Sequence, residues 1–147
     1  MIKKKKLLLL ILMCSVNVAS ANCLFNVSNL DFGNYHSPYQ RTDVLSSSPI
    51  GVMCDNTSSG NTLTIKMYQG QSSNYNRYLS NGQDNLYYNL YLDSARSVVW
   101  GDGTNGTSVY NGAINQNTNV MIFSSIFKKQ NISPGMYQDS IVFEMSF

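Results

Sequence analysis

The sequence predicts an all-β protein, an antiparallel β-sandwich, on three observations. Short runs alternate between apolar and polar residues, which is the pattern of half-buried strands. Clusters rich in Asn, Ser and Gly separate these runs about every ten residues, as in sandwiches with tight turns. No window of about eleven residues has the periodicity of an amphipathic helix. A chain of 147 residues suits a single domain.

The first 21 residues have the features of a secretory signal peptide. Residues 3–6 are all lysine, and residues 7–13 form an apolar run that is too short to span a bilayer. Residues 19–21, Ala-Ser-Ala, form a small-x-small cleavage site. We therefore predict a signal peptide over residues 1–21 and a mature domain over residues 22–147, without a membrane span. The alternative, an N-terminal membrane anchor, is disfavoured because the apolar run ends too early.

Removal of this leader changes the charge of the chain. The formal net charge is +2 for all 147 residues, but the four leader lysines would be lost. Six basic residues would then face eight acidic ones, a net charge of −2. The mature chain has no basic patch for nucleic acid or anionic lipid.

Two cysteines, Cys23 and Cys54, remain after Cys14 leaves with the leader. An even number of cysteines in an exported chain predicts a disulfide. It would close a loop of about thirty residues and contribute roughly 3–4 kcal/mol in the chain-entropy model. Two buried free thiols are the alternative, which an oxidising compartment disfavours.

The first half of the mature chain contains several predicted strands. A strand at residues 22–27 carries Cys23, and the apolar residues of LDFGNY at 30–35 lie two apart around a glycine bend. Residues 36–48 read as a polar loop, residues 50–54 as a strand and residues 55–61 as a turn. In residues 62–68 the alternation places Leu63, Ile65 and Met67 inward.

The stretch at residues 86–103, LYYNLYLDSARSVVWGDG, is the centre of the predicted sandwich and contains Trp100, the only tryptophan. Its alternation predicts a strand with Leu86, Tyr88, Leu90 and Leu92 on one face and with Tyr87, Asn89, Tyr91 and Asp93 on the other. After a polar turn, residues 98–100 form a second short apolar stretch, which the sequence Gly-Asp-Gly ends.

The last part of the chain predicts a small hairpin near residues 109–110 and a strand at 119–127 that is covered on both faces. A final strand at residues 137–147 runs to the last residue, with Ile141, Phe143, Met145 and Phe147 on one face. Nothing follows that could cover its edge, and a bare edge invites pairing with other chains. We expect either an internal strand or a partner's added strand to cover it.

The sequence offers no recognisable catalytic, cofactor or metal site. His36 is the only histidine and lies in a polar loop, and no nucleophile-elbow pattern is present. Asp102 could ligate a cation, but one carboxylate in a Gly-rich turn is a poor site. We therefore expect a protein that is not an enzyme.

The chain resembles the spore coat protein U domain family, the domain of archaic chaperone–usher pilins of the Csu type. The resemblance rests on Cys23 near the cleavage site, on LDFGNY, on Cys54 and on Arg77, and it extends through residues 86–104 and 134–147. The central motif comprises Tyr88, Asn89, Tyr91, Asp93, Arg96, Trp100, Gly101, Asp102 and Gly103.

The resemblance implies an immunoglobulin-like, pilin-like sandwich that lacks its final strand. The gap would be a groove beside the C-terminal strand, filled first by a periplasmic chaperone and then by another pilus subunit after passage through an outer-membrane usher. Transferred to this sequence, one wall of the strand-acceptor groove would comprise Ile141, Phe143, Met145 and Phe147, and the carboxylate of Phe147 would be an anchor for the chaperone. The chain would be exported through the inner membrane, cross the periplasm, and end in a surface fimbrium or be secreted.

Two functional hypotheses follow. The first is a structural subunit of a surface fibre, assembled by donor-strand complementation and serving adhesion or biofilm formation. Only Asn22 would precede Cys23 after cleavage, so the subunit could accept a strand but not donate one, which favours a tip or terminal position. The alternative is a self-contained secreted coat or matrix sandwich, with glycan bound by tyrosines such as Tyr68, Tyr87 and Tyr91.

Overall fold

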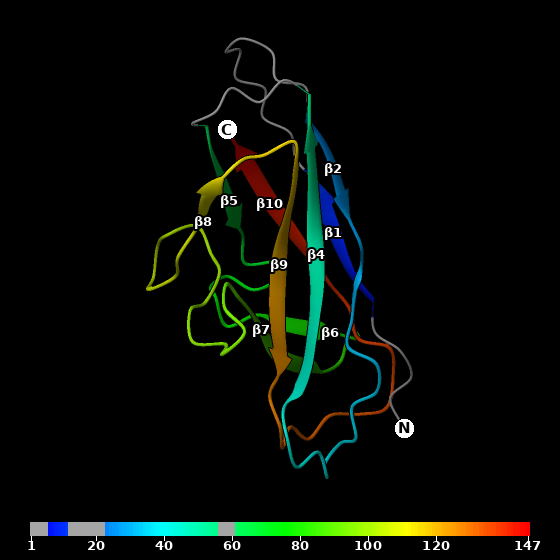
Figure 1. Ribbon diagram of the computed structural model, residues 1–147. Helices are drawn as coiled ribbons and strands as arrows, with labels where there is room; N and C mark the ends of the chain where they lie inside the picture. Colours follow the sequence, from blue (N-terminus) through cyan, green and yellow to red (C-terminus); the bar gives the residue numbers. More distant parts are fainter. Residues whose placement is uncertain (1–5, 12–22, 56–60) are drawn as a thin grey trace.

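The computed structural model describes residues 6–11, 23–55 and 61–147, and these residues form ten strands and no helix. The strands make two stacked five-stranded sheets, which confirms the predicted β-sandwich (Figure 1). Sheet A has the order β3-β1-β10-β5-β8, and sheet B has the order β2-β4-β9-β7-β6. The bounds are β1 Lys6–Ile11, β2 Cys23–Val27, β3 Leu30–Asp31, β4 Val44–Cys54, β5 Thr62–Met67, β6 Tyr78–Ser80, β7 Asn85–Tyr91, β8 Tyr110–Ala113, β9 Asn117–Ile126 and β10 Asp139–Ser146.

The core lies between the two sheets and follows from the period-two alternation of their strands. Sheet A contributes alternate residues of β5 and β10, and sheet B contributes those of β4 and β7. Side chains from these four strands without solvent exposure are Leu63, Ile65, Met67, Ile141, Phe143, Ile50, Val52, Leu86, Tyr88 and Leu90. The predicted facing of residues 62–68, and of residues 86–90 on the apolar side, is therefore confirmed.

The predicted polar loop at residues 36–48 is too long, because β4 already begins at Val44. Its backbone pairs with β9 from Val44 opposite Ile126 onward. Ser48 points into the core, and the carbonyl of Ser46 accepts a hydrogen bond from Ser124 Oγ at 2.9 Å. A run of serines reads as loop in a sequence, but here its short side chains fit the strand pairing.

Two other predictions of facing are also wrong. Met121 of β9 is 39% exposed while Ile122 is buried, so this part of β9 alternates, and only its end at Ser124, Ser125 and Ile126 is buried on both faces. On β7, Asn89 and Tyr91 were expected outward but are buried. Asn89 is covered because its amide donates to the carbonyl of Tyr75, in the loop before β6.

Within the described ranges, no helix is long and apolar enough to cross a membrane. The predicted cleavage site at residue 21 lies outside the described residues, so cleavage stays a prediction. Residues 6–11 of the predicted leader are described, and they form a strand of the sandwich, β1.

Candidate strand-acceptor site

The C-terminal strand β10 lies inside sheet A, with a partner on each edge. On one side it pairs with β5 in antiparallel orientation, from Phe143 opposite Met67 to Ser146 opposite Thr64. On the other side it pairs with β1 in parallel orientation, from Leu7 opposite Asp139 to Ile11 opposite Phe143. The edge that the sequence left bare is therefore covered by an internal strand of the full chain (Figure 1).

The covering strand comes from the predicted leader. β1 also pairs with β3, where Lys6 lies opposite Asp31 and Leu7 opposite Leu30. No other described strand stands between β3 and β10 in sheet A. A chain without residues 1–21 would thus have two strands, β3 and β10, whose facing backbone groups have no partner from that position. We call this position the acceptor site.

The four predicted wall residues do not all lie beside the acceptor site. Ile141 and Phe143 are fully buried and fall within the segment that pairs with β1. Met145 is only partly buried, and Phe147 is 46% exposed with its ring 6.3 Å from that of Phe25. Both lie beyond the pairing with β1, so a wall of all four residues stays a prediction.

The outer face of β10 carries a polar cluster. Glu144 accepts a hydrogen bond from Tyr68 Oη at 2.7 Å and pairs with Lys66 Nζ at 3.4 Å. The Tyr68 hydrogen bond, followed by the Lys66 charge, lowers the pKa of Glu144. The same hydrogen bond raises the pKa of Tyr68. This cluster fixes β10 to β5 on the side away from the acceptor site.

The start of β10 is fixed by a buried carboxylate, that of Asp139. It accepts hydrogen bonds from Tyr88 Oη at 2.7 Å and from the backbone N–H of Gln71 at 3.0 Å. Gly70, at φ +72°, leaves the space that the carboxylate occupies, since a Cβ there would collide with it. Burial, followed by the Asp139 charge, raises the pKa of Tyr88 well above its usual value. Tyr88 of sheet B thereby positions the first residue of β10 opposite β1.

A buried cation, Arg77, connects the two sheets close to this point. Its guanidinium donates to Asn89 Oδ1 and to the carbonyl of Trp100, both at 2.7 Å, and to the carbonyl of Tyr68 at 3.0 Å. It also lies 5.0 Å from the ring centroid of Tyr75. Burial lowers the pKa of Arg77, and burial is also the main cause that raises the pKa of Tyr75 to about 12.

The other motif residues hold loops in place. Asp93 accepts from the backbone N–H of Val98 and from the hydroxyl of Ser97, and Asp102 accepts from the hydroxyl and the backbone N–H of Thr104. These hydrogen bonds are the main causes that lower the pKa of each carboxyl. Arg96 Nε donates to the carbonyl of Ser124 at 3.0 Å, and Trp100 Nε1 donates to the carbonyl of Ile65 at 2.9 Å. Gly101 approaches Thr107 closely, and Gly103 has a φ of +90°.

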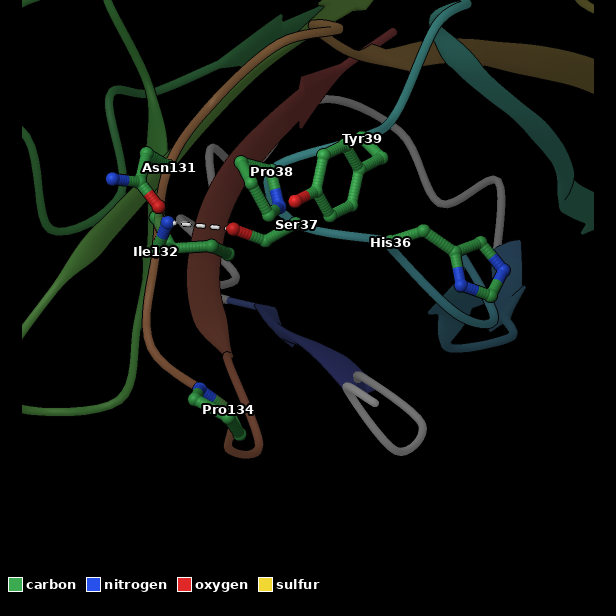
Figure 2. Close-up of a pocket in the computed structure, with 7 residues that line it drawn as sticks. All are labelled: His36, Ser37, Pro38, Tyr39, Asn131, Ile132 and Pro134. Carbon is green, nitrogen blue, oxygen red and sulfur yellow. Dashed lines mark hydrogen bonds between the residues drawn. The ribbon is translucent and has the colours of Figure 1, made fainter.

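His36 lines a shallow hollow of about 340 Å³ at the end of the sandwich, together with Pro38, Tyr39, Asn131 and other loop residues. In Figure 2 its imidazole points away from Asn131 and Ile132. The backbone N–H of Ile132 donates to Ser37 Oγ at 2.8 Å. The described part of the chain contains no group of three metal-ligating side chains. The expectation of no catalytic or metal site stays a prediction.

The predicted disulfide is confirmed. Cys23 of β2 and Cys54 of β4 are bonded and lie directly opposite each other in sheet B. The sequence did not single out Asp139 as a site residue. A signal was nevertheless present: Asp139 is an acidic residue that the alternation of the strand places on the same face as Ile141 and Phe143. The burial of Arg77 has no comparable signal, because its acceptors are mostly backbone carbonyls, those of Met67, Tyr68 and Trp100.

The described residues form a β-sandwich in which an N-terminal strand, β1, covers one edge of the C-terminal strand, β10. The sequence matches the Spore Coat Protein U domain over residues 10–144, and the chain belongs to that family. Among curated proteins, no sequence matches it. A similar solved structure is the CsuC–CsuE chaperone–tip adhesion subunit pre-assembly complex from the archaic chaperone–usher Csu pili of Acinetobacter baumannii. The identity is 18% and the TM-score 0.60, over 87% of this chain and 40% of that chain, so this chain spans less than half of its length.

Proposed function

We propose that this protein is an exported structural subunit of a chaperone–usher surface fibre, and that it is assembled by strand addition at the acceptor site. The observation that carries the proposal is the position of β10. Among the described strands, β1 alone covers its edge toward β3, and β1 belongs to the predicted leader. The family membership and the similarity to a chaperone–subunit complex support the same function.

The physical basis is β-augmentation. An added strand supplies backbone hydrogen bonds to β3 and β10, and its alternate side chains meet the core positions of sheet A. Ile141 and Phe143, both fully buried, are the core residues that such a strand would have to cover. The partners are a periplasmic chaperone, an outer-membrane usher and neighbouring subunits, so the path runs through the periplasm to the cell surface.

The test is expression of residues 22–147 in a periplasm, with and without a periplasmic chaperone from the same genome, followed by size exclusion and co-purification. We expect soluble monomer only as a one-to-one complex with the chaperone. A stable monomer that forms without the chaperone would overturn the proposal. It would favour the self-contained coat or matrix sandwich instead.

Within the fibre we propose a tip or terminal position and a role in adhesion and biofilm formation. β2 begins at Cys23, two residues after the predicted cleavage site, which leaves the processed chain no free segment to donate. Immunogold labelling of fibres is expected to mark one end of each fibre. Labelling along the whole shaft would exclude the terminal position, and unchanged surface attachment without this subunit would exclude the adhesive role.

A further inference from the structure

Three exposed cationic side chains lie at one end of the sandwich. Arg41 precedes β4, and Lys128 and Lys129 follow β9. Because β4 and β9 are antiparallel, with Val44 opposite Ile126, the two loops emerge at the same end although they are far apart in the sequence. In Figure 1 this is the lower end, away from the C-terminus. We call the three residues the cationic end.

The loops of the cationic end are held in place by hydrogen bonds. The backbone N–H of Lys129 donates to the carbonyl of Gln40 at 3.0 Å, which joins the two loops. The buried Tyr35 supports them from the core, because its hydroxyl donates to the carbonyl of Phe127 at 2.9 Å and accepts from the backbone N–H of Gln130 at 2.8 Å. A preformed loop loses little conformational entropy when a ligand binds to it.

The charges of the cationic end are not neutralised within the described part of the chain. The salt bridge found there joins Lys66 to Glu144, on the outer face of sheet A. Asp43 lies in the same loop as Arg41, but its carboxylate accepts from the backbone N–H of Lys128 at 3.0 Å and from Ser125 Oγ at 3.4 Å. The other basic residues after the predicted leader are paired, buried or bonded to backbone carbonyls, namely Lys66, Arg77 and Arg96.

The backbone of Lys129 points to a role for its side chain. Its φ is +59°, in the left-handed region that favours glycine or asparagine. Arg96 has a similar φ of +58°, and there the guanidinium donates to the carbonyl of Ser124. No described residue accepts a hydrogen bond from the side chain of Lys129. Local structure thus favours a glycine at this position, and the free positive charge is what a glycine would lack.

We propose that the cationic end binds an anionic polysaccharide, a sugar chain that carries carboxylate or sulfate groups at intervals. The unpaired charges of Arg41, Lys128 and Lys129 complement those groups. The hollow beside them suits the sugar rings, because Tyr39 is 82% exposed there and Asn131 adds an amide (Figure 2). An aromatic ring packs against the apolar face of a sugar, and an amide bonds its hydroxyl groups. This inference deepens the proposed adhesive role and rests on it.

The size of the patch favours a polysaccharide over a membrane or a nucleic acid. Three cations are fewer than the clusters of about four to eight that bind anionic lipid surfaces. Duplex DNA carries one negative charge per about 1.7 Å of its axis, and a processed chain of net charge −2 is repelled by so dense a charge. In a polysaccharide the charged groups are separated by sugar rings, which a small patch and its hollow can contact together.

The first experiment measures binding to immobilised alginate, a polymer of uronic acids. The full chain is exported together with a periplasmic chaperone from the same genome, and the form that purifies is used. Lys128→Gln and the control Lys66→Gln each remove one positive charge. At about 50 mM salt, Lys128→Gln should weaken binding at least about fivefold, and Lys66→Gln less than about twofold. Equal effects would overturn the inference, since net charge would then explain binding, and so would an unchanged protein that does not bind.

A second variant separates the charge of Lys129 from its backbone. Lys129→Gly removes the cation and also relieves the strain of a positive φ. We expect a Tm that is unchanged or higher, together with weaker binding to alginate. A Lys129→Gly chain that binds as tightly as the unchanged protein would overturn the role of this lysine in the site.

Competition identifies the class of ligand. Soluble alginate should displace the protein from the surface, whereas dextran, a neutral polysaccharide, should not. Equal displacement by dextran would overturn the inference, because charge would not be recognised. Stronger displacement by single-stranded DNA or by phosphatidylglycerol vesicles, at equal total charge, would overturn the polysaccharide in favour of a nucleic acid or a membrane.

Attachment of cells to an alginate-coated surface separates this inference from the proposed function. If Lys128→Gln weakens alginate binding in solution but cells without the subunit attach as before, the adhesive role fails and the site remains. If the purified protein does not bind alginate while loss of the subunit abolishes attachment, the cationic end fails and the adhesive role remains.

Discussion

Sheets A and B each contain five strands, but only sheet B is built entirely from residues after the predicted cleavage site. Its strands β2, β4, β9, β7 and β6 come from residues 23–126. Sheet A needs β1, from residues 6–11, to join β3 to β10. Half of the sandwich is thus complete in the processed chain, and the other half depends on a strand that processing would remove.

The family motif lies mostly in the complete half or between the halves. Tyr88, Asn89 and Tyr91 belong to β7 of sheet B, and Arg96 reaches the carbonyl of Ser124 on β9. Tyr88 and Trp100 bond to sheet A, at Asp139 and Ile65. Sheet B and the motif therefore form a support that holds β5 and the start of β10 in place, and the strand exchange that we propose concerns only the position next to β10.

The largest expected effect comes from the group that connects both sheets. Arg77→Met removes a donor to Asn89 in sheet B and to the carbonyl of Met67 in sheet A, so each of these buried acceptors loses a hydrogen bond. We expect the free energy of unfolding of the full chain to fall by about 3–5 kcal/mol in urea titration. The control is Arg41→Met at an exposed position, with a change within about 0.5 kcal/mol. Equal effects of the two substitutions would show that Arg77 does not connect the sheets.

The second prediction concerns sheet B alone. Replacing both Cys23 and Cys54 with Ala removes a cross-link between β2 and β4, over a sequence separation of 31. Loop-closure entropy predicts a loss of about 3 kcal/mol in the free energy of unfolding. The loss should be the same whether the acceptor site is filled by β1 or by an added strand. A loss that depends on the occupant would contradict the independence of the two sheets. Cys14→Ser serves as the control.

Much of this architecture follows from alternation in the sequence. The core positions of β5, β7 and β10 and the disulfide were predicted because period-two patterns and cysteine parity act locally. The extent of β4 and the burial of Asn89 were not predicted, since they depend on pairing with β9 and on a covering loop.

The acceptor site, too, was predicted only in part. The sequence predicted that the edge of β10 needs a cover, because an apolar strand with a bare edge is unfavourable. It could not identify the cover, because residues 7–13 have the composition of a signal peptide and no alternation that marks a strand. Pairing of β1 with β10 is a contact between the two ends of the chain, which no local pattern encodes.

A smaller effect is expected where the motif meets sheet A. Tyr88→Phe removes the donor to Asp139 Oδ2 and should lower the free energy of unfolding by about 1–2 kcal/mol. The loss should be concentrated at the start of β10, with faster amide exchange at residues 139–143 than in β4 or β9. Tyr87→Phe, on the exposed face of the same strand, is the matched control. Uniformly faster exchange in both sheets would show that Tyr88 supports the whole core and not β10 in particular.

The smallest predicted effect is a pH dependence on the outer face of sheet A. The ion pair between Lys66 and Glu144 is the only one among the described residues, and it joins β5 to β10. The pKa of Glu144 is lowered in the folded state, first by the Tyr68 hydroxyl and then by Lys66. The stabilisation is therefore present above the unfolded pKa of about 4.3 and is lost as the pH falls through the lower folded value.

Glu144→Gln tests this dependence. Because the groups are exposed and screened, the variant should lose under about 1 kcal/mol of unfolding free energy at pH 7. The difference from the unchanged chain should disappear below the lowered pKa of folded Glu144, where both chains carry a neutral side chain at this position. A constant difference from there up to pH 7 would assign the effect to packing rather than charge. Glu144 belongs to the segment of β10 that pairs with β5, and β1 lies along the other edge of β10. The substitution should therefore leave amide exchange between β1 and β10 unchanged.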